Sequence, residues 1–238
     1  MPSILVATIP TLCAECPLRH TSICRVLGQG DAAKLEAARG RQFSLRAKRL
    51  LLREGDTPNE VFRVLSGWGA RFRVLANGSR QILSFDLPGD FLTPELLCGE
   101  PARFSKMALT SMTLCAFPRE RTANEVFGDP EKANFIERLL VRRIRDSEDR
   151  IMMLGRLPAA GRIAGLVLDI HRRLSRRGMA AGSEFEFPLR HEDLADALGL
   201  TPAHVSRTLA ALRQNKLLEI HSARAVILDR EGLQKLAS

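Results

Sequence analysis

The sequence predicts an α+β chain built from a β-roll, a long helix and a winged helix-turn-helix, in that order. Three observations indicate this order. Turn residues interrupt residues 41–118 at intervals typical of short strands, apolar side chains recur at helical spacing in residues 130–156, and residues 191–210 carry a glycine between two short helical patterns. A chain of 238 residues is long enough for two ordinary domains.

The composition is that of a folded and basic protein. Hydrophobic residues make up 45% of the chain and charged residues 26%, so the chain can bury a core. Lys and Arg number 36 against 27 Asp and Glu, and the net charge of +9 favours a polyanionic partner such as a nucleic acid. Residues 1–12 are apolar but lack the basic start of a signal peptide, and no apolar run has the length of a membrane span. We therefore expect a cytoplasmic protein without membrane contact.

Five cysteines are present, and three of them lie in an N-terminal segment that we place at residues 1–30. In a reducing compartment, such clustering favours metal or redox chemistry over disulfides. Together with His20, these three cysteines have the spacing of a zinc knuckle with three thiolates and one imidazole. The residues by themselves leave open whether the segment holds zinc, holds another metal centre or stays as reduced thiols.

Residues 31–129 are expected to form the β-roll, which begins with a short helical stretch at residues 31–40. Turn markers rich in Gly, Asn and Asp separate short apolar segments. Asn77-Gly78 lies between two such segments and predicts a β-hairpin, because both residues tolerate positive φ. Many short strands at a spacing of about ten residues favour a small barrel or roll.

Residues 130–156 are expected to form one long dimerisation helix. Its apolar positions advance by alternating steps of four and three residues, which is the spacing of a coiled-coil seam. Two interpretations are compatible with this pattern: the helix packs on its own domain, or it pairs with its twin in a homodimer. We favour the homodimer, whose interface would contain Ile136, Leu140, Ile144, Ser147, Ile151 and Leu154.

Residues 191–210 match the pattern of a helix-turn-helix. Ala195 is small where the two helices approach closely, and Gly199 allows a left-handed turn between them. Thr201 is placed to cap the second helix, with Pro202 in the tolerated first position. The stretch LLEIHSARAVILD follows this motif and predicts a hairpin that would form the wing.

The second helix of this motif is expected to be the recognition helix of a DNA-binding domain at residues 157–238. Val205 and Leu209 share its inward face, so the opposite face would enter the major groove, where Arg207 can bind guanine O6 and N7. Arg224, expected at the tip of the following hairpin, would contact phosphate. A homodimer of such domains reads palindromic double-stranded DNA. The expected DNA-contacting residues are Ala203, His204, Ser206, Arg207, Arg213 and Arg224.

The order of a turn-rich β-roll, a seam helix and a winged helix-turn-helix resembles the CRP/FNR family of bacterial transcription regulators over nearly the whole chain. The resemblance implies that the β-roll is of the cyclic-nucleotide-binding type. LPGDF at residues 87–91 and ALTSMTLCAFP at residues 108–118 are similar to the FNR branch. CAECPLRHTSIC is similar to the oxygen sensors of the FnrN, FixK and FnrL type, whose first three cysteines share the spacing of Cys13, Cys16 and Cys24.

The resemblance implies a [4Fe–4S] cluster bound by Cys13, Cys16, Cys24 and Cys115, with zinc as the alternative metal. Thiolates are soft ligands that suit iron–sulfur clusters. The resemblance further implies that the cluster promotes dimerisation and DNA binding at low oxygen, that oxygen converts or destroys it, and that RNA polymerase is a partner. Cys98 matches no ligand of the family, and we expect it to be a small buried apolar residue.

Three positions depart from the family pattern. Ala203 stands where the recognition helix of the family usually carries Glu, so we expect the base that this Glu contacts to be read more weakly. Ser147 stands where the enterobacterial oxygen sensor of the family carries an Asp that opposes dimerisation. Phe104 replaces the Arg of the motif that binds a cyclic phosphate, so cyclic-nucleotide binding is not expected.

The sequence contains no phosphate-binding glycine loop, nucleophile triad or paired-carboxylate motif. We therefore expect a regulator and not an enzyme. The alternative function is a regulator of the same fold that carries a structural zinc site, or one that responds to haem-bound gas, nitric oxide or another redox signal.

Overall fold

The computed structural model describes residues 12–238, so residues 1–11 of the expected N-terminal segment lie outside the described residues. The chain divides into two compact units. The N-terminal unit contains the described residues up to Arg73 together with Leu83–Arg142, and the C-terminal unit contains Val74–Ile82 together with Arg143–Ser238. One boundary between the units therefore lies within the long helix.

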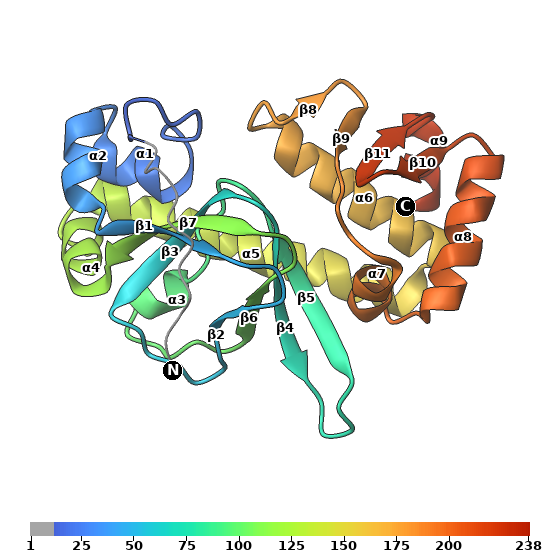
Figure 1. Ribbon diagram of the computed structural model, residues 1–238, viewed down its shortest axis with the longest axis horizontal. Coiled ribbons are helices and arrows are strands. Elements are labelled where there is room, and N and C mark those ends of the chain that lie inside the picture. Colours follow the sequence, from blue (N-terminus) through green and yellow to red (C-terminus); the bar gives the residue numbers. More distant parts are fainter. Residues whose placement is uncertain (1–11) are drawn as a thin grey trace. The chain divides into compact units, whose positions relative to one another are not determined.

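Two antiparallel sheets form the β-roll (Figure 1). The strand order is β1-β7-β3 in the first sheet and β2-β6-β4-β5 in the second. Extended segments rich in Val, Leu and Phe favour strands, because branched and aromatic side chains pack well on a pleated surface. The strands are β1 (Arg41–Leu45), β2 (Leu50–Leu52), β3 (Glu60–Ser66), β4 (Gly69–Val74), β5 (Arg80–Asp86), β6 (Ser105–Ala108) and β7 (Met112–Pro118).

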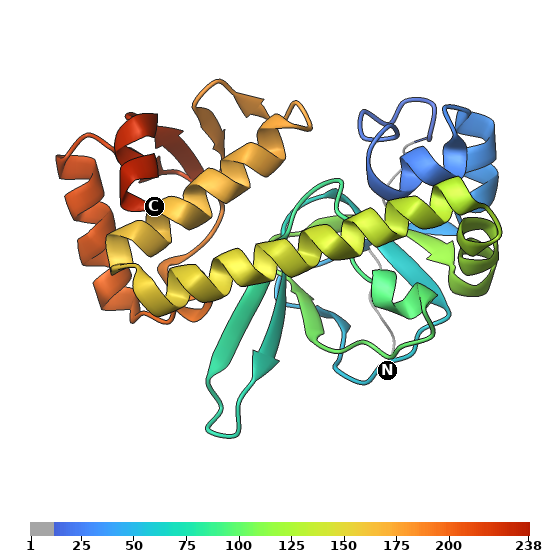
Figure 2. The same cartoon turned by 180° about the vertical axis from the view of Figure 1, so that it is seen from behind.

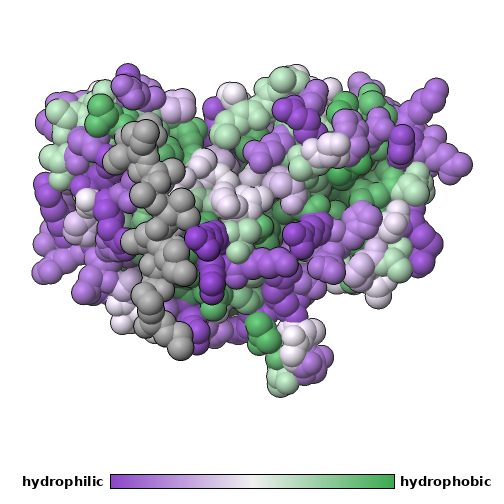
Figure 3. All heavy atoms as spheres, viewed as in Figure 1, coloured by the Kyte–Doolittle hydropathy of each residue, from purple (hydrophilic) through white to green (hydrophobic). Residues whose placement is uncertain are grey.

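The hairpin predicted from Asn77-Gly78 joins β4 to β5, and this prediction is confirmed. Gly78 has φ +81°, a backbone conformation that favours glycine. The side-chain Oδ1 of Asn77 accepts a hydrogen bond from the backbone N–H of Ser79 at 3.0 Å, which stabilises the turn. Val74 and Leu75 lie exposed beside this turn, where Figure 3 shows green side chains at the tip of the hairpin.

Short helices lie beside the first sheet in the N-terminal unit (Figure 1). Asp31 caps the second of them, since its side chain accepts hydrogen bonds from the backbone N–H groups of Ala33 and Lys34. This helix lies within the expected helical stretch at residues 31–40. The helices are α1 (Ser22–Gly28), α2 (Ala32–Ala38), α3 (Pro94–Leu97) and α4 (Arg119–Phe127).

The first sheet is covered on both faces, because its side chains alternate between two buried clusters. Phe62 and Leu114 belong to one cluster, whereas Val61 and Cys115 belong to the other. The second cluster also contains Cys13, Cys24 and residues of α1, α2, α4 and the long helix. The pleat of β7 therefore turns Cys115 toward the cysteine-rich segment.

The long helix α5 (Pro130–Arg156) has the bounds that the sequence predicts, and Figure 2 shows it as one uninterrupted helix. Its first turns pack against the N-terminal unit. Ile136 is only 1% exposed and belongs to the same buried cluster as Cys115, so its assignment to a dimer seam is wrong. The physical reason is that the same apolar stripe first covers the cysteine-rich core and only later faces outward.

Within the described residues, the C-terminal unit combines the end of α5 and four further helices with a small antiparallel sheet of strand order β10-β11-β9-β8. The helices are α6 (Ala159–Ser175), α7 (His191–Leu198), α8 (Pro202–Gln214) and α9 (Arg230–Leu236). The strands are β8 (Ala180–Ala181), β9 (Glu184–Glu186), β10 (Leu218–His221) and β11 (Arg224–Ile227).

The segment at residues 178–183, expected to be a loop, contains the short strand β8. Ala180 and Ala181 pair with the neighbouring strand β9 across a tight turn at Gly182 and Ser183, and β9 in turn pairs with β11. No helix within residues 12–238 has both the length and the apolar character needed to cross a membrane.

Candidate nucleic-acid interface and cysteine site

The helix-turn-helix is formed by α7 and α8, and its predicted local geometry is confirmed. Gly199 has φ +63° and ψ +41°, and its N–H donates to the carbonyl of Ala195 at the end of α7. The hydroxyl of Thr201 accepts a hydrogen bond from the N–H of His204 at 3.2 Å, and Pro202 begins α8. Both ends of the turn are therefore fixed by residues of the motif itself.

Helix α8 has one buried face and one exposed face. Val205 and Leu212 are buried, and Leu209 is half-buried beside them. The residues on the opposite face are small or polar. The exposed positions are Ala203, His204, Ser206, Arg207 and Ala210, which is the face expected to enter the major groove.

The basic residues of this surface differ in how strongly they are already paired. Within the described residues, Arg207 is exposed and makes no hydrogen bond or ion pair, so its guanidinium is available for a ligand. The Nη2 atom of Arg213 lies 3.1 Å from a carboxylate oxygen of Glu219, an ion pair that reduces its net charge toward a ligand. Arg207 is accordingly the stronger candidate for a base contact.

The wing is formed by β10 and β11, and the position expected for Arg224 needs a correction. The tip consists of Ser222 and Ala223, which have φ +47° and +61°, whereas Arg224 is the first residue of β11. Its Nη1 atom donates to a carboxylate oxygen of Glu184 at 2.6 Å. The strand pairing of β11 with β9 brings these two residues together, so Arg224 is exposed but already paired.

The remaining seam positions of α5 are half-buried or exposed. Leu140 is half-buried against the N-terminal core, whereas Ile144 and Ile151 are 58% and 72% exposed. The exposed hydroxyl of Ser147 donates to the carbonyl of Arg143, and Leu154 is half-buried. Large exposed apolar side chains at helical spacing are typical of a surface that another helix covers.

The four cysteines implied as ligands are all buried in the N-terminal unit. Cys13 and Cys16 lie in the turns before α1, and Cys24 lies on α1 itself. Cys115 lies in the middle of β7, between its register partners Gln42 on β1 and Arg63 on β3. Two segments that are distant in sequence thus contribute thiols to one buried region.

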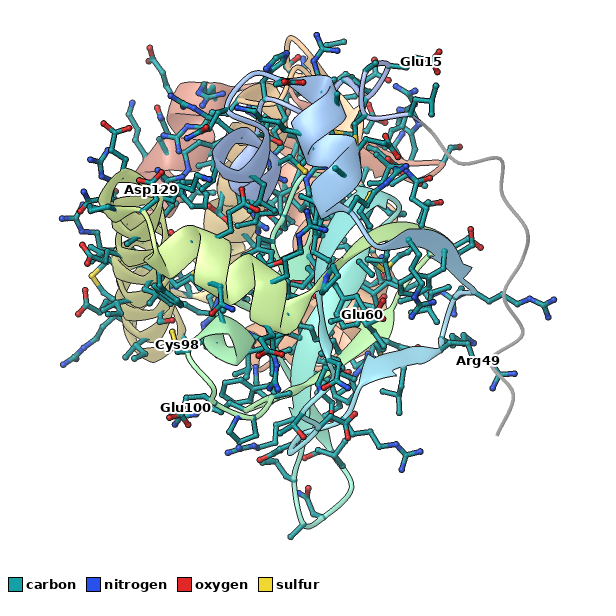
Figure 4. All side chains as sticks on the ribbon, turned by 90° about the vertical axis from the view of Figure 1, so that its left-hand side faces the viewer. Glu15, Arg49, Glu60, Cys98, Glu100 and Asp129 are labelled. Carbon is teal, nitrogen blue, oxygen red and sulfur yellow. The ribbon has the colours of Figure 1, made fainter. Side chains whose placement is uncertain are left out.

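Cys98 behaves differently from these four. It is exposed after α3, so the expectation of a small buried residue is wrong. Figure 4 shows the labelled Cys98 at the surface, well separated from Glu15, which marks the cysteine-rich segment. The helix ends at Leu97, and the chain turns outward through Gly99, which has φ +81°.

In the described part of the chain, the side chains do not form a site for a single metal ion. Among residues 12–238, no three His, Cys, Asp or Glu side chains converge closely enough to hold one ion. His20 is exposed, and its Nε2 atom accepts a hydrogen bond from Nε of Arg19 at 2.8 Å. The imidazole needed for a zinc knuckle is therefore not gathered with the buried thiols.

Burial controls the protonation of the thiols. It raises the pKa of Cys13 to about 12 and that of Cys24 to about 12, and it also raises the pKa of Cys115. The charge of Arg63 opposes this effect at Cys24 and Cys115. Metal ligation requires thiolates, so these thiols need positive charge, from a metal or from nearby side chains, to ionise.

Three charged residues around the thiols were not identified from the sequence. Glu36 accepts a hydrogen bond from the backbone N–H of Cys13 at 2.7 Å and forms an ion pair with Arg39. Arg63 is buried, and its Nη2 donates to the carbonyl of Leu18 at 2.7 Å. Arg63 interrupts the apolar run of EVFRVLS, and a charge in such a strand is the sequence signal that points to it.

Phe104 occupies the position where the family motif has an Arg. The guanidinium groups of Arg71, Arg73 and Arg103 lie 5.0–5.6 Å from the centroid of its ring. The ring offers these cations a π-face and brings no charge of its own toward a phosphate.

Known proteins resemble this chain in sequence and in fold. The chain is 31% identical over 225 residues to the transcriptional activator protein FnrA of Stutzerimonas stutzeri, which covers 94% of this chain and 92% of the relative. It is 25% identical to an anaerobic regulatory protein of Pasteurella multocida, over 94% of this chain and 82% of the relative. The structure of FixK2 from Bradyrhizobium japonicum matches with a TM-score of 0.75 and 27% identity, covering 83% of this chain and 97% of that structure.

Two domain families also match. Residues 42–127 match the cyclic nucleotide-binding domain, and residues 161–236 match the Crp-like helix-turn-helix domain. This combination defines a DNA-binding transcription regulator. The chain belongs to the CRP/FNR family, which confirms the resemblance seen in the sequence. Its relatives are regulators and not enzymes, as expected.

Proposed function

We propose that this regulator binds palindromic DNA as a homodimer and responds to oxygen through a [4Fe–4S] cluster bound by Cys13, Cys16, Cys24 and Cys115. The observation that carries the proposal is the burial of these four thiols in one region of the N-terminal unit. Cys13, Cys24 and Cys115 belong to one buried cluster, and Cys16 lies in the same segment as Cys13. When bound, the cluster supplies the redox reactivity toward oxygen.

The donor set favours a cluster over a zinc knuckle. Four thiolates are the common ligand set of a [4Fe–4S] cluster. Such a cluster offers a separate iron corner to each thiolate, so its ligands need not converge on one atom, as the ligands of a single zinc ion do. His20 is exposed and its Nε2 atom accepts a hydrogen bond from Arg19, which also disfavours a zinc knuckle.

The core that contains the cysteines also supports the start of α5. Cys13, Cys24 and Cys115 share their buried cluster with Ile136, and Leu140 packs against it. Ligation by thiolates from both segments would tie the N-terminal segment to β7 within this core. Loss of these bonds would loosen the packing beneath the first turns of α5. The exposed apolar residues later in this helix would then be held less firmly in position.

The exposed part of α5 is the surface that we assign to the homodimer. Ile144 and Ile151 expose large apolar side chains, which a second copy of the helix would cover. A two-fold pair of α8 helices then reads half-sites about one helical turn apart, with Arg207 on a guanine of each. The names of two relatives, a transcriptional activator and an anaerobic regulatory protein, support an activator that works without oxygen. The resemblance to the family implies RNA polymerase as its partner.

Metal analysis of protein purified without oxygen tests this function. We expect a brown protein that contains iron and sulfide, binds a palindromic site, and loses this binding after exposure to air. A colourless protein with stoichiometric zinc would contradict the cluster, and a Soret band would indicate haem in its place.

The variants His20→Ala and Cys115→Ala separate the two metal sites. A four-cysteine cluster predicts that His20→Ala keeps its iron, because His20 lies outside the buried set. It also predicts that Cys115→Ala loses iron. The zinc knuckle predicts the reverse ranking, with metal lost from His20→Ala and kept by Cys115→Ala.

A further inference from the structure

Arg63 is a buried cation without an acidic partner among the described residues. Its side chain is 1% exposed and lies on the central part of β3. Nη2 donates to the carbonyl of Leu18 at 2.7 Å and to the hydroxyl of Thr21 at 3.1 Å. Both acceptors are neutral, and Nε is buried without any hydrogen-bond partner in the described part of the chain.

A buried lysine and a partly buried arginine of the same unit do have such partners. Lys106 is buried with Asp86, and its Nζ lies 3.1 and 3.2 Å from the two carboxylate oxygens. Arg39 forms an ion pair with Glu36. An isolated charge in a protein interior is costly, so buried charges are normally paired with an opposite charge. Arg63 therefore lies where an additional negative charge would stabilise it.

The thiols, once ionised, are the groups that would supply this negative charge. Arg63 is the register partner of Cys115 across the β3–β7 ladder, so both side chains leave the sheet on the same face. Its hydrogen bonds to Leu18 and Thr21 hold the loop that connects Cys16 to Cys24. Arg63 thus contacts the cysteine-rich segment and faces β7 at Cys115, the two parts that a shared ligand would join.

We propose that Arg63 is a positioning residue for the metal centre, which holds the Leu18–Thr21 loop and supplies the positive charge that balances the thiolate-bound cluster. This inference rests on the proposed function. A [4Fe–4S] core bound by four thiolates carries a net negative charge, and reduction potentials of such clusters depend on the charge around them. A fixed cation beside the cluster raises its potential and so opposes the transfer of one electron from the cluster to O₂.

Replacing Arg63 by Met tests the charge while keeping a long apolar side chain in the core. In full-length protein purified without oxygen, we expect the one-electron equilibrium of the cluster to shift about tenfold toward oxidation, a lowering of the potential by about 59 mV. The half-life of the cluster absorbance after addition of a fixed amount of O₂ should shorten in parallel. Redox titration measures the potential, and the absorbance followed after mixing with oxygen measures the half-life.

Two control variants separate charge from structure. Arg63→Lys keeps the charge and should stay closer to the parent protein than Arg63→Met in both measurements. Thr21→Val removes the hydrogen bond that Thr21 accepts from Arg63 and the one that it donates to Leu18, but no charge, so its potential should shift less than that of Arg63→Met. If Arg63→Met assembles no cluster whereas Arg63→Lys does, the charge is needed for assembly, which also supports the inference.

Several outcomes would overturn the inference, and they differ from a failure of the proposed function. A parent protein with iron and sulfide, together with an unchanged potential and oxygen half-life in Arg63→Met, would remove the role of Arg63 alone. Equal losses in Arg63→Met and Arg63→Lys, including failure of both to assemble a cluster, would show that the hydrogen bonds matter and the charge does not. A parent protein without iron and sulfide would remove both proposals.

Discussion

The helix-turn-helix and the cysteine site of this regulator are assembled in opposite ways. The turn of the helix-turn-helix is shaped by residues of the motif itself, since Gly199 and Thr201 set its geometry locally. The cysteine site joins a loop and a short helix to the middle of β7, so it forms only once the strands have paired in register. Local geometry can be read along the chain, whereas the partners in a buried site depend on which faces of distant segments meet.

The largest expected effect tests whether the cysteine site needs both of its distant parts. We expect Cys24→Ala and Cys115→Ala to lose the bound iron to a similar extent, because each removes one ligand of a shared cluster. Cys98→Ala is the matched control and should keep its iron, since Cys98 is exposed and outside the buried set. Iron and sulfide per chain in anaerobically purified protein measure the effect. Full iron in Cys115→Ala would show that the N-terminal segment binds the metal by itself.

The second prediction concerns the helix that follows the cysteine-rich core. Ile151→Glu places a charge in an apolar contact on both subunits, so we expect monomers with intact helices and no binding to a palindromic site. Arg145→Glu changes the charge of the same exposed helix outside the seam and should remain dimeric. Sedimentation and a binding assay provide the measurements. A dimeric Ile151→Glu protein would place the dimer contact elsewhere.

The third prediction tests the locally encoded site. Arg207→Ala should weaken specific DNA binding by about 1–3 kcal/mol and relax the preference for one guanine, because the unpaired guanidinium is lost. Arg213→Ala should weaken binding less and equally on all sequences, since Arg213 is paired with Glu219. Competition between specific and scrambled duplexes at fixed salt measures both. Uniform weakening in Arg207→Ala would mean that this residue contacts only phosphate.

The smallest expected effect tests the turn of the helix-turn-helix. Gly199→Ala should lower the free energy of unfolding by about 1–2 kcal/mol, because an L side chain at positive φ is strained. The only atom near the added Cβ within the described residues is Nη1 of Arg162, at 3.8 Å, so a steric clash does not contribute. Gly155→Ala in the open surface of α5 should instead raise stability by about 0.5–1 kcal/mol. Denaturant titration compares the two, and equal losses would contradict the role of the turn.

The sequence by itself determined the features that depend on neighbouring residues. The glycine turn, the threonine cap and the exposed face of α8 followed from spacing alone, since a helix repeats its faces every few residues. The Asn77-Gly78 hairpin and the bounds of α5 followed for the same reason. In each case the chemistry of a few adjacent residues restricts the backbone to one conformation.

Tertiary structure decided which side chains share a buried environment. It placed Cys115 on the face of β7 that meets the cysteine-rich segment, and it left Cys98 exposed against the expectation from its apolar character. It also buried Ile136 in the N-terminal core and enclosed Arg63 without a carboxylate among the described residues. A period of two or of three to four residues identifies the two faces of an element, but only the packing of distant elements decides what each face meets.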